Sequence, residues 1–214
     1  MHSTLKRSKA AHGIIFLTAL GAVAVVLSPL TWPWYLLLPL LVYAFVVLAW
    51  PPLRRTAPRF AFGRWRGWPL VAAAGLSVAT SVALLAFQTL ARPEVADLAT
   101  AVPVAVFGNL LFACICFSVA NATLEELIFR GILWEVAAAE WSVGVALVAT
   151  TVLFGLGHLH GYPPGPLGAV LASIFGLALG LLRWWTGGLG LAIAVHVCAD
   201  ATIFGLLCSS GAFQ

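Results

Sequence analysis

Residues 69–91 read PLVAAAGLSVATSVALLAFQTLA, and this stretch contains no charged side chain. An α-helix of this length spans roughly 34 Å at 1.5 Å per residue, which matches the ~30 Å hydrocarbon core of a bilayer. Similar apolar runs recur along the chain, which is 62% hydrophobic and only 8% charged. Soluble domains have about 45–50% apolar and roughly 25% charged residues. The composition therefore predicts a polytopic membrane protein without a separate soluble domain.

Hydropathy predicts about seven helices, and hence an all-α, polytopic transmembrane helical bundle. The predicted helices cover residues 13–30, 34–50, 69–91, from near 102 into 125–131, 142–158, 167–182 and 189–207. We divide the chain into residues 1–100, with three helices and a basic linker at 51–68, and a helical core, residues 101–214, that holds the catalytic motifs described below. We expect the first helix to be retained, because no clear signal-peptide cleavage site follows it.

Positively charged residues predict the orientation of the chain. Basic side chains precede the first helix, and five arginines lie in the linker 51–68. Lys and Arg are enriched in cytoplasmic loops, so we expect the N-terminus and this linker in the cytosol, in contact with the lipid bilayer rather than with nucleic acid. Tryptophans near the predicted helix ends are typical of an aromatic belt: Trp32, Trp34, Trp50, Trp65, Trp68, Trp184 and Trp185.

A few polar residues lie within the apolar segments, where a charge costs ~2.5–3.5 kcal/mol and usually marks function. Glu126 and Arg130 are four residues apart, so on a helix they share a face and can pair. Glu125 is rotated by about 100° from Glu126, which predicts that one carboxylate is structural while its neighbour faces a cavity. Asn121, one turn before Glu125, is interpreted as a hydrogen-bond donor in helix packing.

Three histidines complete this polar set. His196 and Asp200 repeat the four-residue spacing, His158 ends a predicted helix, and His160 follows in a Gly/Pro-rich loop, where we interpret it as a loop residue. A carboxylate can hold a water molecule and remove its proton, a histidine can share that water, and a second histidine with a polar partner can stabilise an oxyanion. This set of groups suits peptide hydrolysis without a covalent intermediate.

Two other interpretations stay open at the level of sequence. Glu125, His158 and His196 could together bind zinc, although the chain contains no HExxH motif. The polar cluster could instead only fix helix packing in a non-enzymatic membrane scaffold or immunity protein. A serine hydrolase has little support, because no serine lies in a GxSxG context.

The motifs resemble those of the CPBP family of intramembrane proteases, which includes the type II CAAX prenyl endopeptidases and bacterial Abi-type proteins. EELIFRG, residues 125–131, resembles the EExxxR motif of that family. FGLGH, residues 154–158, resembles its FxxxH motif, and HVCAD, residues 196–200, resembles HxxxN with Asp in the last position. The resemblance covers residues 104–207.

The resemblance implies a glutamate-dependent endopeptidase that needs neither a metal nor another cofactor. Glu125 would be the general base, His158 would help to activate the water, and His196 and Asp200 would stabilise the oxyanion. An ionised Asp cannot donate a hydrogen bond, so Asp200 is either protonated or orients His196.

By the same resemblance, Glu126 and Arg130 support the first motif. The implied substrate is a membrane protein or the C-terminal tail of a lipidated or exported protein, cut near the membrane boundary. The expected location is a bacterial cytoplasmic (inner) membrane.

A helix that begins near residue 102 would place Glu125 roughly 34 Å along its axis, near the cytosolic boundary. His158, at the end of the next helix, would then lie near the opposite face of the membrane. For the motifs to meet, the helix that carries Glu125 must start later or continue past Arg130.

Overall fold

A computed structural model of the protein describes residues 2–27, 31–94 and 107–210, with side chains described from Lys9 onward. These residues form α-helices and one π-helical segment, and no strand occurs among them. The elements are α1 (His2–Val26), α2 (Trp34–Ala49), α3 (Pro51–Thr56), α4 (Trp68–Ala91), α6 (Leu110–Glu126), η2 (Leu127–Leu133), α7 (Trp134–Glu140), α8 (Val143–Gly157), α9 (Gly165–Thr186) and α10 (Gly190–Ser209). The prediction of an all-α helical bundle is confirmed.

Within the described part of the chain, five helical segments are long and apolar enough to cross a membrane: Lys9–Val26, Trp68–Ala91, Leu110–Glu140, Gly165–Thr186 and Gly190–Ser209. Helices α2 and α8 are shorter but also apolar. Together they match the seven helices expected from hydropathy, and the protein is an integral membrane protein.

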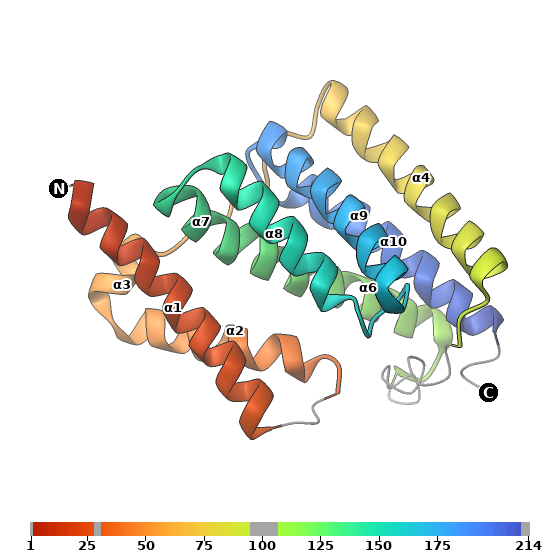
Figure 1. Cartoon of the computed structure of the whole chain (residues 1–214), viewed down its shortest axis with the longest axis horizontal. Coiled ribbons are helices and arrows are strands. Elements are labelled where there is room, and N and C mark those ends of the chain that lie inside the picture. The colour runs from red at the N-terminus through yellow and green to blue at the C-terminus, as the bar shows by residue number, and fades with distance from the viewer. Residues whose placement is uncertain (1, 28–30, 95–106, 211–214) are drawn as a thin grey trace.

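Helices α8, α9, α10 and α4 lie side by side in Figure 1, and α1–α3 lie at the opposite end of the molecule from α4. Helix α10 packs against α6, α4 and α9, while α8 packs against α9 and α7. Helices α1 and α2 therefore cover one side of the 107–210 region and α4 covers another. The division of the chain at residue 100 remains a prediction.

Helices α6, η2 and α7 run on without a break from Leu110 to Glu140. The side chain of Asn109 accepts a hydrogen bond from the backbone N–H of Phe112 and caps the start of α6. The expected start near residue 102 lies outside the described residues. Because this continuous helix begins at Leu110 and ends well past Arg130, Glu125 lies midway along it, about 23 Å from either end. Helix α8 then turns back, and His158 follows its last residue, Gly157, at a similar distance of about 22 Å from the turn after Glu140. The expected conflict between the heights of Glu125 and His158 in the membrane therefore does not arise.

The basic linker is partly helical, because α3 begins directly at Pro51. Beyond α3 its backbone runs against the turn between α9 and α10. The carbonyls of Ala61 and Phe62 accept hydrogen bonds from Leu189 and Gly190, at 2.8 and 3.0 Å. The linker thus fixes the start of α10, the helix that carries two of the predicted site residues.

Helices α8 and α9 approach closely at Gly155. A Cβ atom at this position would lie 1.9 Å from Ser173 Oγ and 2.6 Å from the carbonyl oxygen of Ala169. Small residues permit this kind of close helix–helix contact inside a bilayer. The contact fixes the height at which α8 ends, and thereby the position of His158.

We predict that Gly155→Ala lowers the thermal unfolding temperature of the detergent-purified protein, because the added methyl group forces α8 away from α9, at a cost of about 1–3 kcal/mol. Gly144→Ala on the same helix is the matched control, since only Ser142 Oγ lies within 4 Å of its Cβ, at 3.8 Å. Equal unfolding temperatures for the two variants would show that the close approach is unimportant.

Candidate functional site

A buried ion pair lies at the centre of the site. Arg130 Nη1 donates to Glu126 Oε1 at 2.7 Å, and both side chains are fully buried. Arg130 Nη2 donates to the carbonyl oxygen of Gly176 at 2.8 Å, and the guanidinium lies 4.4 Å from the centroid of the Phe154 ring. The arginine thereby ties η2 to α9 and α8. The structure confirms the pairing expected from the i, i+4 spacing.

His196 comes from α10 and joins the same pair. Its Nδ1 atom lies 2.9 Å from Glu126 Oε1, and because an ionised carboxylate only accepts hydrogen bonds, Nδ1 is the donor. Its Nε2 atom faces Glu125 Oε2 and Asp200 Oδ1, each at 3.7 Å. The structure therefore brings Glu125, His196 and Asp200 together, with Glu126 behind the imidazole.

Asn121 bridges the two remaining carboxylates. Its Nδ2 atom donates to Glu125 Oε1 at 3.3 Å and to Asp200 Oδ2 at 3.2 Å. Its Oδ1 atom accepts from the indole nitrogen of Trp32 at 3.1 Å. Trp32 is only 6% exposed, so its assignment to the interfacial aromatic belt was wrong. This indole is drawn inward because it has a buried acceptor.

His158 is placed differently from His196. It caps the C-terminus of α8, and its Nδ1 atom donates to the carbonyl oxygen of Phe154 at 2.8 Å. Among the described residues, no hydrogen bond or ion pair joins His158 to Glu125 or His196. His158 meets them only across the cavities described next. His160 is exposed in the loop after α8, as expected.

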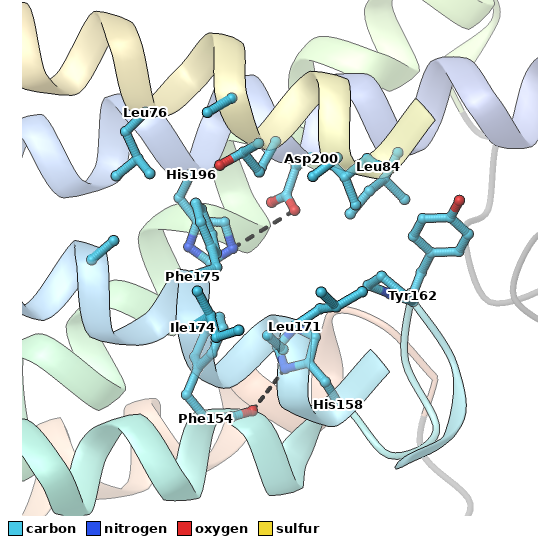
Figure 2. A pocket seen from close by; sticks show the side chains of 18 residues that line it. Leu76, Leu84, Phe154, His158, Tyr162, Leu171, Ile174, Phe175, His196 and Asp200 are labelled. Atoms are coloured by element: carbon cyan, nitrogen blue, oxygen red, sulfur yellow. Dashed lines mark hydrogen bonds and ion pairs between the residues drawn. The ribbon is translucent and has the colours of Figure 1, made fainter. Parts of the chain in front are cut away.

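An apolar cavity of about 250 Å³ lies between α4, α9, α10 and the end of α8. Figure 2 shows His196 and Asp200 pointing into it from α10, with His158 and Phe154 on the facing wall. A second cavity, of about 340 Å³, lies between α2, α6, α10 and the end of α8 and is lined by Glu125 and Asn121. Both cavities are lined by His158, Tyr162, Asp200 and Ile203. Residues from all three motifs therefore border two neighbouring cavities that share these four side chains.

Tyr162 lines both cavities. Its hydroxyl donates to Gln88 Oε1 at 2.8 Å, which ties the loop after α8 to α4. Burial raises the pKa of Tyr162 to about 12, so the phenol remains a neutral hydrogen-bond donor at physiological pH.

The family model for type II CAAX prenyl endopeptidases, Rce1-like, matches residues 107–202. This region is therefore similar to the Rce1-like family, which is a protease family. The match contains all three motifs and confirms the resemblance to the CPBP family. Neither the curated proteins nor the solved structures contain a match to the chain.

Two side chains at the site of the Rce1-like domain were not assigned to it from the sequence. Asn121 precedes Glu125 by four residues, so the spacing predicts that the two share a helix face. The spacing could not have predicted the contact of Asn121 with Asp200, which lies on another helix. Trp32 carries no such signal, because it lies 89 residues from Asn121 along the chain. Among the described residues, no group of three His, Cys, Asp or Glu side chains is placed to hold a metal ion.

We predict that Arg130→Ala sharply lowers the folded yield of the protein, measured as the monodisperse fraction in detergent. Removing one partner of a buried ion pair leaves an uncompensated charge and costs about 3–5 kcal/mol. Arg66→Ala in the exposed part of the linker is the control and should leave the yield unchanged. A normal yield for Arg130→Ala would mean that the pair does not stabilise the bundle.

Proposed function

We propose that the Rce1-like domain hydrolyses a peptide bond with a water molecule activated by Glu125. The observation that carries this proposal is the division between two adjacent acids. Glu126 is locked between Arg130 and His196, whereas Glu125 lines a cavity together with His158 and Asp200. A purely structural acid pair gives no reason for one of its members to border a cavity with a histidine.

The two oxygens of Glu125 differ in their surroundings. Oε1 accepts a hydrogen bond from Asn121, whereas Oε2 has no hydrogen-bond partner among the described residues. We assign to Oε2 the removal of a proton from water, while the water oxygen attacks the carbonyl carbon of the scissile bond. When the C–N bond then breaks, Glu125 returns this proton to the leaving amine, which regenerates the carboxylate. Because Nδ1 of His158 donates to Phe154, its Nε2 is the ring atom suited to accept a hydrogen bond from the water or to relay that proton.

The oxyanion of the tetrahedral intermediate is assigned to His196. Because Nδ1 already donates to Glu126, Nε2 can donate only when the ring carries both protons. An imidazolium at this position is supported by three carboxylates within 4 Å: Glu125, Glu126 and Asp200. Asp200 accepts from Asn121 on one oxygen and faces Nε2 with the other, which supports an orienting role for Asp200.

The apolar cavity supports a lipid-linked or strongly apolar substrate. It is lined by α4 residues such as Leu76 and Ala83, and by Leu171 and Phe175 from α9. An aliphatic chain or an apolar side chain next to the scissile bond would lie there within reach of His196. We propose as substrate a membrane protein, or the C-terminal tail of a lipidated or exported protein, cut near the membrane boundary.

We predict that Glu125→Gln lowers kcat for cleavage of a fluorogenic lipidated or apolar C-terminal peptide by about 10²–10⁴-fold, because the amide cannot accept the proton of the water. Glu140→Gln at the C-terminal end of the same continuous helix is the matched control and should keep wild-type kcat. Full activity of folded Glu125→Gln would overturn the proposed mechanism.

The same assay separates the other two interpretations. A zinc enzyme would lose activity in the presence of 1,10-phenanthroline and would contain one metal per chain by elemental analysis. A glutamate-dependent enzyme would keep its rate. A non-enzymatic scaffold would cleave no peptide, and its Glu125→Gln variant would have the same folded yield as the wild-type protein.

We propose that the chain lies in a bacterial cytoplasmic membrane with its N-terminus in the cytosol, as the basic linker indicates. In a bacterial expression host, a fluorescent protein fused before Met1 should fluoresce, whereas alkaline phosphatase at the same position should be inactive. The reverse result would place the linker on the outer side.

A further inference from the structure

The orientation of the Asn121 amide is determined by its neighbours. The indole nitrogen of Trp32 can only donate, so the oxygen of the Asn121 amide must face Trp32. The NH2 group then faces Glu125 and Asp200, and its two N–H bonds serve one carboxylate each. The opposite orientation would place an oxygen against both carboxylates and an NH2 group against the indole N–H.

Asn121 binds only one oxygen of each acid. It holds Glu125 Oε1 and Asp200 Oδ2, which leaves Glu125 Oε2 and Asp200 Oδ1 facing His196 Nε2 at equal distances of 3.7 Å. Asn121, Glu125, His196 and Asp200 thus form a closed ring of four side chains from α6 and α10. We call this arrangement the amide ring.

The third motif, HVCAD, ends in Asp200 in this chain. The amide of the amide ring is supplied instead by Asn121 of α6. We propose that Asn121, held by Trp32, is a positioning residue that fixes the rotamers of Glu125 and Asp200. In this proposal Asn121 and Asp200 form an acid–amide pair between α6 and α10. Swapping the acid and the amide between the two positions should preserve that pair. The inference rests on the proposed hydrolytic function, because the positioned group is its general base.

A packing role alone does not account for this arrangement. Asn121 is 8% exposed, and every hydrogen-bond donor of its side chain is used by a carboxylate. A buried amide needs hydrogen-bond partners in any role, but here both partners are carboxylates that line the same cavity. An isosteric acid at position 121 would put a third carboxylate against Glu125 and Asp200 and would remove both N–H donors.

The exchange is tested with three variants of the full-length protein in detergent: Asn121→Asp, Asp200→Asn and the double variant. Asp200→Asn keeps an acceptor for Asn121 and should retain at least about a tenth of wild-type kcat. Asn121→Asp should lower kcat about 100-fold. The double variant restores an amide opposite an acid between positions 121 and 200 but leaves a carboxylate against Glu125, so its kcat should recover only part of this loss, about 10-fold relative to Asn121→Asp.

KM provides a second measurement. Both N–H groups of Asn121 bond within the protein, so KM for the fluorogenic peptide should stay within about 3-fold of wild type in all three variants. A double variant no more active than folded Asn121→Asp would overturn the proposal, and so would a loss confined to KM. If Asn121→Asp alone does not fold, recovery of folded yield in the double variant supports the exchange, and no recovery overturns it.

Trp32 is tested with a matched pair. Trp32→Phe keeps an aromatic ring against Phe117 but removes the N–H donor to Asn121, so kcat should fall about 3–10-fold. Trp34→Phe makes the same change at a side chain that is 48% exposed and should have no effect on kcat. Equal kcat values for the two variants would remove Trp32 from the proposal.

These outcomes are separable from a failure of the proposed function. If the wild-type protein cleaves no peptide, the hydrolytic role fails, and the acid–amide exchange is then judged by the unfolding temperatures of the same three variants. A double variant more stable than Asn121→Asp would retain the pair as a structural element. Additive losses of stability would reject the pair as well.

Discussion

The site depends on the buried interaction between Glu126 and Arg130. A charge inside the bilayer is tolerated only when it is paired and its donors are satisfied, and Arg130 meets this condition through Glu126, the carbonyl oxygen of Gly176 and the face of Phe154. These partners lie on α6, α9 and α8. One guanidinium therefore determines the relative placement of three helices, and Glu126 in turn orients His196.

This pair also explains why the adjacent acid is available for chemistry. The α-helix places consecutive side chains about 100° apart, so locking Glu126 inward turns Glu125 toward the cavity. The chain then changes to a π-helix at Leu127–Leu133, a feature that is often found at functional sites. Arg130 lies in this segment and pairs with Glu126, and the next residue, Gly131, packs against Phe60 of the linker.

The two cavities divide the surroundings of the site by chemistry. One has a mostly apolar lining and lies between α4, α9, α10 and the end of α8, whereas the other is also lined by the carboxylate and amide groups of α6. His158 and Asp200 border both cavities. In the proposed reaction, an apolar group next to the scissile bond would occupy the apolar cavity, which would allow the rest of the substrate to stay in the membrane.

The sequence by itself determined the helical bundle, because long runs without charge have no other stable form in a bilayer. It also determined the Glu126–Arg130 pair and the different direction of Glu125, about 100° away, since both follow from the period of a single helix. Only the tertiary structure decided that His196 and Asp200 reach these acids, that His158 meets them across a cavity, and that Trp32 orients Asn121. Those contacts join segments far apart in the chain, and their geometry depends on where each helix begins and ends, which apolar composition does not specify.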